Sequence, residues 1–541
     1  MRKKHILLLV IPVYYLIFFS FIRYTQGPYY SNMLYDPTYV YLISSTNLAQ
    51  GIGVLHTDHP GSPVQIIGAV IIKFLHFALG TTNDISLSVF RTPESYANSI
   101  YIALIILNAI GMFLMGLMIF KKVNNIYVAF IFQLSPLICF SVFRRLTQVS
   151  SEVFLVFVLL ILIAFLIKFI YELEISPRKM NYYMIVFGVI CGLAIVTKLS
   201  SVTLLIIPFF LLHGFFRKIM FLVIALITFL ATIYPVVSYP QFFIDYTYNT
   251  LIKSGRYGKG ESNIFQGSVL LQNLQKIFTG EILLSITLVL ILVVIIISFF
   301  KIDKVSVTKS SKEKNLLLLI FFSIILNIIM VSKNFWSHYL LIVLMLLLPS
   351  IYLMISLFKD KSYIKKNYNI IFILIDSLIS ILILFNSIEF YKKEKLGREE
   401  SKKFETFLSS NTENTLGIYT FGISNEDLAL LFSSQYAGKT MKEYFNKITH
   451  ESPEFLYYDA WNGRIRSWWI TENYDDKEKI KQKLQLGKKL LYYKRAGITP
   501  YDTNDSLLNI LKVQFGFRNP KLEKIFSNKT NESVYEVILD K

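Results

Sequence analysis

The chain has 541 residues, of which 54% are hydrophobic and 15% aromatic, and its mean hydropathy is +0.51. A soluble protein of this length needs a more polar surface, so this composition excludes an ordinary soluble enzyme. The formal net charge is +19, but much of the basic excess lies in short loops between apolar blocks, where it is typical of membrane topology signals. We therefore expect membrane lipids, and no nucleic acid, as partners.

The N-terminus has a basic start and an apolar core without a small-residue cleavage site, which predicts an uncleaved signal anchor. A later apolar stretch, 64–79, contains Lys73 and His76 and predicts an amphipathic helix lying on the membrane surface. The longer apolar blocks predict about 11 membrane spans. These lie at about 5–22, 97–120, 126–143, 153–171, 182–197, 200–214, 217–236, 281–300, 316–332, 338–358 and 368–388.

Basic residues mark every second loop, which predicts a cytoplasmic N-terminus. The marked positions are Arg2, Lys3, Lys4, Lys121, Lys122, Arg178, Lys179, Arg217, Lys218, Lys301, Lys304, Lys309, Lys312, Lys314, Lys359, Lys361, Lys365 and Lys366. The opposite loops are then external. They are 23–96, 144–152, the region of Lys198, 237–280, 333–337 and everything after about 389.

The first external loop, 23–96, holds two acidic positions of interest. Asp36 precedes Pro37 and an apolar run, which fits a helix N-cap and equally a carboxylate that an amphipathic helix holds at the membrane surface as a general base. Asp58 and His59 stand in TDHPG, which fits a plain turn, an acceptor-binding pair or part of a metal site. A divalent cation is therefore left open as a cofactor.

Several cations interrupt external edges against the positive-inside trend. An ionisable residue at a span boundary is costly unless it faces water or a partner, and guanidinium and ammonium groups suit phosphate. Lys198 could also reach the interface with its side chain, and Glu152 fits a favourable charge at a helix N-terminus. The candidate phosphate-binding residues are Arg144, Arg145, Lys198, Lys333 and His338.

From Lys392 onward the chain is polar, with short strand-like runs such as TLGIYTF, EFLYYDAW and SVYEVIL. Helix-like stretches, EDLALLFSSQY and DDKEKIKQKLQ, lie between these runs. About 150 residues can bury a core of their own. We expect a soluble extracytoplasmic α/β domain over 391–541.

The segments YDPTYVYL and DHPGSP in the first loop, GLAIVTKLSS around Lys198 and SKNFWSHYL before a late span together resemble the GT-C superfamily of glycosyltransferases. That superfamily includes protein O-mannosyltransferases and aminoarabinose transferases, and the resemblance covers about residues 1–390. It implies a GT-C-like catalytic domain over 1–390, a sugar donor on a polyprenyl phosphate, and Asp36 as the catalytic base. Pro37 replaces the second acid of the mannosyltransferases' Asp-Glu pair.

The expected fold is thus a polytopic α-helical membrane protein with a C-terminal α/β domain. The expected function is an inverting transfer of a sugar from a polyprenyl-phosphate donor to an extracytoplasmic protein, lipid or glycan hydroxyl. A transporter or flippase, a polysaccharide polymerase or ligase with a lipid-linked donor, and a receptor presenting the terminal domain are the alternatives. The Lys-, Ile- and Asn-rich composition favours a bacterial inner membrane.

Overall fold

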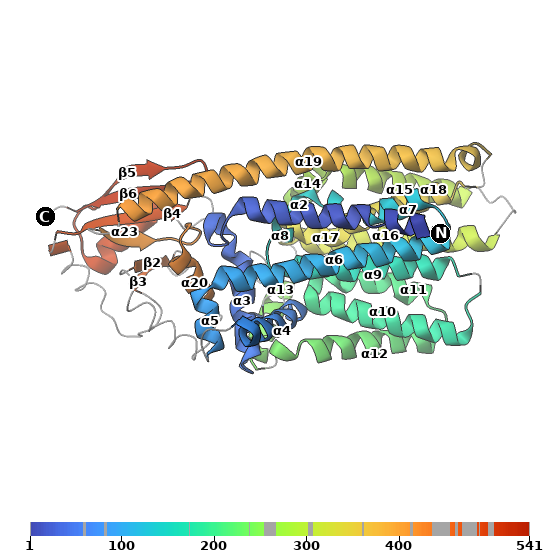
Figure 1. Ribbon diagram of the computed structural model, residues 1–541, viewed down its shortest axis with the longest axis horizontal. Helices are drawn as coiled ribbons and strands as arrows, with labels where there is room; N and C mark the ends of the chain where they lie inside the picture. The colour runs from blue at the N-terminus through green and yellow to red at the C-terminus, as the bar shows by residue number, and fades with distance from the viewer. Residues whose placement is uncertain are drawn as a thin grey trace. The chain divides into compact units, whose positions relative to one another are not determined.

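The structure is a computed structural model (Figure 1). It describes residues 2–57, 61–79, 84–172, 174–236, 238–253, 267–300, 307–359, 362–411, 415–434, 455–459, 464–467, 484–485, 487–495 and 503–539. The chain divides into two compact units. The first contains 1–21, 51–71 and 98–389, and the second contains 22–50, 72–97 and 390–541.

Long apolar helices dominate the described part of the chain. Nine helices there are long and apolar enough to cross a membrane, and a bent pair, Gly267–Gly280 with Ile282–Ser298 at 95°, would make a tenth. The nine are His5–Gln26, Ser62–Leu79, Pro93–Val123, Ser151–Ile170, Pro177–Thr197, Phe215–Thr232, Ser311–Ser332, Ser337–Ser356 and Lys366–Ser410. A polytopic membrane protein is therefore confirmed, with nine or ten candidate spans where the sequence predicted about 11.

The helices up to residue 410 have the following bounds. They are α1 (Arg2–Leu7), α2 (Val10–Gln26), α3 (Tyr35–Ala49), α4 (Ser62–Leu79), α5 (Ile85–Arg91), α6 (Pro93–Val123), α7 (Ile126–Gln133), α8 (Phe143–Leu146), α9 (Ser151–Ile170), α10 (Pro177–Thr197), α11 (Ile206–Leu211), α12 (Phe215–Thr232), α13 (Pro240–Ile252), α14 (Gly267–Gly280), α15 (Ile282–Phe300), α16 (Val307–Ser332), α17 (Leu341–Met345), α18 (Leu347–Ser356) and α19 (Ser362–Ser410).

Three apolar stretches differ from expectation. The stretch 126–143 does not form one helix, because α7 ends before Pro136 and the chain continues in 3-10 turns; proline lacks the N–H that the next helical turn needs. The stretch 200–214 forms only a short apolar helix, Leu199–Leu211. Conversely, α4 was expected to lie on the membrane surface, yet its length and composition are those of a span.

Close packing of α10 against α12 fixes the helix that leads to Lys198 (Figure 1). A Cβ built on Gly188 would lie 2.7 Å from Ile224, and one built on Gly192 would lie 2.5 Å from the carbonyl oxygen of Ala225. Small residues four positions apart let two membrane helices approach closely. The spacing of these glycines thus explains why α10 and α12 pair.

The second unit contains a six-stranded mixed sheet with the strand order β3-β2-β1-β4-β6-β5. β1 is parallel to both β2 and β4, whereas β3, β5 and β6 join antiparallel. The strands are β1 (Thr415–Tyr419), β2 (Phe455–Asp459), β3 (Arg464–Ser467), β4 (Lys489–Arg495), β5 (Lys521–Ser527) and β6 (Glu532–Ile538). Each of the three predicted strand runs therefore contains a strand, and the C-terminal α/β fold is confirmed.

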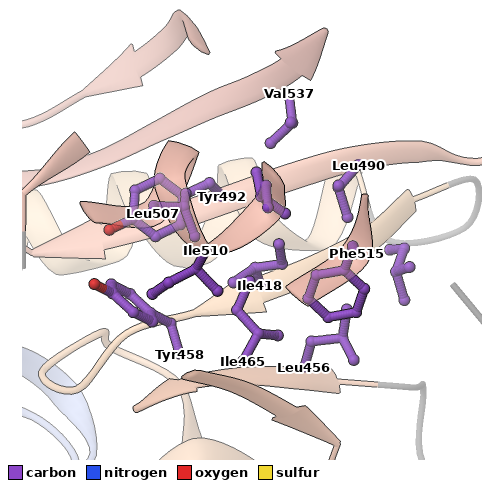
Figure 2. Close-up of a cluster of buried hydrophobic side chains, with 12 residues drawn as sticks. Ile418, Leu456, Tyr458, Ile465, Leu490, Tyr492, Leu507, Ile510, Phe515 and Val537 are labelled. Atoms are coloured by element: carbon purple, nitrogen blue, oxygen red, sulfur yellow. The ribbon is translucent and has the colours of Figure 1, made fainter. Parts of the chain in front are cut away.

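Two helices of the second unit, α20 and α23, lie between strands of the sheet in the sequence. α20 (Glu426–Ser434) coincides with the predicted helix, and α23 (Asn504–Phe515) begins at a Thr503 side chain that accepts from the Ser506 N–H and ends at Gly516 in the left-handed region. The predicted helix DDKEKIKQKLQ lies mostly outside the described residues. Figure 2 shows the core that α23 forms with the sheet. Its buried members are Leu416, Ile418, Leu456, Tyr458, Ile465, Leu490, Tyr492, Leu507, Ile510, Leu511, Phe515 and Val537.

Candidate functional site

Lys198 occupies the C-terminal end of α10, in the first unit. Its backbone is extended, its N–H still donates to the carbonyl of Ala194, and a 3-10 turn follows it. The side chain is only 3% exposed, so it does not reach out to an aqueous interface. A buried ammonium needs partners, because losing its hydration is expensive.

Three groups surround the Lys198 ammonium. The Oε1 atom of Glu152 lies 2.5 Å from Nζ, the ring of Tyr339 lies 4.5 Å away, and the carbonyl of His338 accepts a hydrogen bond at 3.5 Å. A charge-assisted hydrogen bond and a cation–π contact together compensate a buried cation. Lys198 is thus one half of a buried ion pair.

Glu152 is the centre of this cluster. It is the second residue of α9 and is 5% exposed; Ser151 Oγ donates to its Oε2 at 3.3 Å, and His338 Nε2 lies 3.8 Å from Oε1. Its place in the first turn of α9 fits the expected helix-terminus charge. The structure adds direct partners from two other helical segments, so the carboxylate also joins α9 to α10 and to the turn before α17.

His338 and Arg145 complete the cluster around Glu152. The His338 ring meets the Tyr339 ring edge-on at 4.5 Å, in the 3-10 turn Ser337–Leu340. Arg145, in the short helix α8, donates to Gln148 Oε1 at 3.2 Å and interacts electrostatically with both Glu152 and Lys198. Arg144 precedes it and is half-buried. We call Glu152, Lys198, His338, Tyr339 and Arg145 the ion-pair cluster.

Lys333 makes different contacts from the other candidate cations. Its ammonium donates to the carbonyls of Thr250 at 2.9 Å and Leu251 at 2.5 Å, which belong to the last turn of α13. A cation there satisfies terminal carbonyls and complements the helix dipole. Partial burial lowers the pKa of Lys333 below its ordinary value. The structure therefore gives Lys333 a helix-capping contact.

Asp36 belongs to the second unit. It is half-buried and its backbone is extended at φ −97°, ψ 108°, so the regular helix begins at Pro37. The expectation that α3 is amphipathic is wrong, because twelve of its residues are buried, on every side of the helix. A helix that is covered all round packs inside a protein rather than on a membrane surface.

A second carboxylate, which the sequence did not single out, lies against α3 within the same unit. Glu94 Oε1 accepts from the Tyr39 hydroxyl at 2.6 Å and from the Tyr29 N–H at 2.7 Å. Tyr39 is one helical turn after Asp36. The only signal in the sequence was the acid directly after Pro93, at a helix start.

Asp58 and His59 lie outside the described residues. Within the described residues, no group of three or more His, Cys, Asp or Glu side chains is arranged to hold a metal ion. The divalent cation left open by the TDHPG motif therefore stays a prediction.

Among known proteins, a solved structure aligns with nearly the whole of this chain. No protein-family model matches the sequence, and no curated protein matches it. Among solved structures, the chain aligns with the crystal structure of ArnT from Cupriavidus metallidurans bound to undecaprenyl phosphate. The alignment covers 97% of each chain at 11% identity, with a TM-score of 0.47. This similarity is too low to support an inference about activity, which therefore has to come from the residues.

Proposed function

We propose that this chain is an integral membrane glycosyltransferase that moves a sugar from a polyprenyl-phosphate donor to a hydroxyl acceptor with inversion. The observation that carries the proposal is the ion-pair cluster. An ionisable cluster buried at the ends of membrane helices is costly, so it is kept where a function needs it. Three of the cations expected from the sequence to bind phosphate, Lys198, His338 and Arg145, belong to that cluster.

The chemistry of the cluster suits a phosphate monoester or diester. An ammonium has three N–H donors, and Glu152 and the His338 carbonyl accept from two of those on Lys198. In the proposed complex a phosphate oxygen accepts from the third. Arg145 supplies the net positive charge that the neutral Lys198–Glu152 pair lacks, and it stabilises the charge that develops on the leaving polyprenyl phosphate.

In the proposed reaction Asp36 takes the proton of the acceptor hydroxyl. The acceptor oxygen forms a bond to the anomeric carbon while the bond from that carbon to the phosphate oxygen breaks. Polyprenyl phosphate leaves with the bonding electron pair, and the configuration at the anomeric carbon inverts. Glu94 and Asp58 are the alternative bases if Asp36 is replaced without effect.

We also propose that the cluster faces the extracytoplasmic side. α9 has 20 residues and is therefore about 30 Å long, which matches a bilayer core. Glu152 begins it, whereas Glu172, just beyond its other end, pairs with Lys122 at 3.0 Å and Lys179 at 3.3 Å. A basic loop cluster favours the cytoplasmic face. Labelling of single cysteines in the 172–176 and 333–337 loops of intact cells tests this topology.

The test of function uses purified protein in lipid nanodiscs. Undecaprenyl phosphate binding is measured for the wild type, Lys198→Met and Arg145→Gln, with Lys333→Met as the matched lysine control. We expect weaker binding in the first two variants and unchanged binding in the control. Transfer from a panel of radiolabelled polyprenyl-phosphate sugars is measured for the wild type, Asp36→Asn and the control Asp245→Asn, whose exposed carboxylate accepts from Gln241 within α13. We expect transfer to be lost only in Asp36→Asn.

A transporter is the second candidate, and one observation favours it. The helices α14 and α15 form a pair bent by 95°, and broken helices with buried charges are typical of transporters. The two proposals differ in product. Release of free polyprenyl phosphate from a labelled donor supports the transferase, whereas movement of intact donor between leaflets without cleavage supports the transporter.

A further inference from the structure

The carboxyl ends of two parallel strands, β1 and β4, meet at one edge of the sheet in the second unit. In open α/β sheets, ligands bind outside the carboxyl ends of parallel strands, where the chain crosses to opposite sides of a central strand. Here β2 and β4 flank β1, so β1 is that central strand. The residues that follow β1 and end β4 hold a segment of the same chain, Ser31–Tyr35, at this edge.

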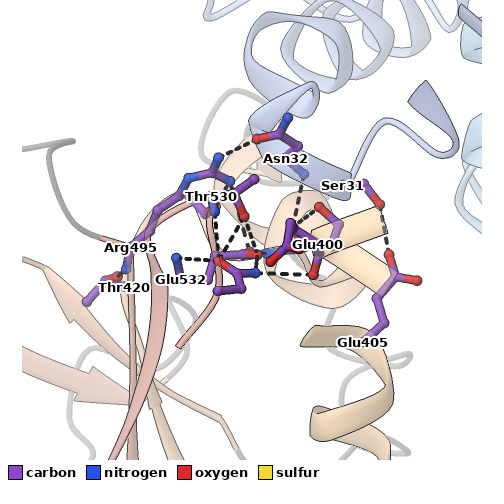
Figure 3. A network of polar contacts seen from close by, with 12 residues as sticks. Ser31, Asn32, Glu400, Glu405, Thr420, Arg495, Thr530 and Glu532 are labelled. Carbon is purple, nitrogen blue, oxygen red and sulfur yellow. Dashed lines mark hydrogen bonds and ion pairs between the residues drawn. The ribbon is translucent and has the colours of Figure 1, made fainter. Parts of the chain in front are cut away.

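Arg495, the last residue of β4, makes the central contacts. Its Nη1 donates to the carbonyl of Gly422 at 3.0 Å and its Nη2 donates to Oδ1 of Asn32 (Figure 3). Glu532, which is fully buried, lies 4.0 Å from Nη1 and accepts from the Ser424 N–H at 2.8 Å. The Asn32 N–H in turn donates to Ser424 Oγ at 2.9 Å. Both the backbone and the side chain of Asn32 are thus fixed.

Asn32 and Met33 have a backbone conformation that needs such support. Their φ angles are +51° and +61°, in the left-handed region that L-residues with a side chain rarely occupy. Two successive residues of this kind persist only where surrounding contacts hold them, and such strain is often found next to functional groups. The contacts from Arg495 and Ser424 provide that support.

The other end of the segment is also held, one residue before the proposed base. The Tyr35 hydroxyl accepts from the Gly422 N–H at 2.7 Å. Its ring meets the rings of Phe421 and Phe432, with centroids 5.7 Å away in each case. Asp36 follows directly, and its own backbone is extended although it lies within the bounds of α3. The backbone that carries the Asp36 carboxylate is therefore anchored to the residues after β1.

We propose that the C-terminal α/β domain positions the catalytic base: the carboxyl-end edge of β1 and β4, with Arg495 at its centre, holds Ser31–Tyr35 and so sets the place of Asp36. This inference rests on the role proposed for Asp36. Arg495 acts through Asn32 and does not touch substrate, so it is a positioning residue. In other open α/β sheets the carboxyl-end edge binds small molecules. In this domain the same edge binds the segment Ser31–Tyr35 of the chain itself.

The test compares Arg495→Gln with Lys489→Gln in the full-length protein in nanodiscs. Lys489 begins the same strand, and its side chain is 64% exposed and paired with Glu536, so its loss removes the same charge without touching the segment. We expect Arg495→Gln to lower kcat for sugar transfer by about a hundredfold, as a small misplacement of a reacting group does. KM for the donor should stay within about twofold. Lys489→Gln should match the wild type in both constants.

A second pair of variants covers the case in which Arg495→Gln does not fold. Asn32→Asp keeps an acceptor for Arg495 and tolerates the left-handed conformation, whereas Asn32→Ala keeps neither. We expect kcat to survive in Asn32→Asp and to fall in Asn32→Ala. Equal kcat values in both Asn32 variants would overturn the proposal.

Hydrogen exchange of the peptides that cover residues 29–40 separates this inference from the proposed function. Faster exchange in Arg495→Gln, with unchanged exchange in Lys489→Gln, shows that Arg495 holds the segment Ser31–Tyr35; we call this contact the anchor. If the wild type nevertheless transfers no sugar, the proposed function fails and the anchor stands. Unchanged exchange in Arg495→Gln refutes the anchor. Faster exchange together with wild-type kcat refutes the positioning role while leaving the transferase intact.

Discussion

Removing one member of the Lys198–Glu152 pair should destabilise the protein far more than removing both. The two side chains are 3% and 5% exposed and 2.5 Å apart. Breaking a buried pair typically costs about 3–5 kcal/mol, because a charge is left without compensation, whereas replacing both members is often neutral. The structure also predicts an asymmetry between the two single variants.

The asymmetry comes from the neighbours of the pair. Glu152→Gln leaves Lys198 close to the charge of Arg145, so its cost should approach the upper value of about 5 kcal/mol. Lys198→Met leaves Glu152 with His338 at 3.8 Å and Arg145 nearby, so its cost should be nearer about 3 kcal/mol. The double variant Glu152→Gln/Lys198→Met should lose less free energy of unfolding than either single variant.

The assay is reversible unfolding in mixed detergent micelles with an increasing fraction of sodium dodecyl sulfate, followed by far-ultraviolet circular dichroism. The four proteins form a double-mutant cycle, which isolates the coupling between the two side chains. If the losses of the single variants simply add in the double variant, the pair does not form. Binding of undecaprenyl phosphate should remain weakened in the double variant even where its stability recovers, which separates the stabilising role from the proposed phosphate contact.

Two further predictions concern helix packing and pH. Gly192→Ala should lower the free energy of unfolding by about 1–3 kcal/mol, because the new methyl group meets the Ala225 carbonyl at 2.5 Å; Gly267→Ala, where a Cβ meets nothing within 4 Å, is the control and should not destabilise. Burial raises the pKa of the Asp427 carboxyl above its ordinary value. The protonated carboxyl therefore contributes fully to the free energy of unfolding at pH values below the ordinary pKa, and this contribution is lost as the pH rises through the raised pKa. Relative to the wild type, Asp427→Asn should therefore gain stability across that pH range in thermal melts; a constant difference at every pH would contradict the assignment.

The helices were largely predictable from local sequence. Runs such as 153–171 and 182–197 are long, apolar and bounded by charges, and they appear as α9 and α10. The strands β1, β2 and β6 were also predicted, because short apolar runs stand out against a polar background. Prediction was less accurate where a single proline or ionisable residue stood inside an apolar stretch long enough to span a membrane. Pro136 divides an apolar block of sufficient length, and Lys73 and His76 made α4 resemble a surface helix.

The candidate site was predictable only in part. Lys198 and His338 were singled out because each places a polar, ionisable group against an edge predicted to be external, and the structure brings both to Glu152. Lys333 carried the same signal, yet it caps α13. One sequence cannot separate these cases, because the partner of each cation lies on a helix distant along the chain.

Hydropathy and the order of polar and apolar residues are properties of neighbouring residues, and they alone determined that this chain crosses a membrane and has a small sheet near its C-terminus. Which carboxylate neutralises Lys198, and which residues hold the strained turn at Asn32, depends on how segments far apart in the sequence pack. Those contacts form because a buried charge needs a compensating partner and a residue in the left-handed region needs stabilising contacts. Only the tertiary structure decides where that support lies.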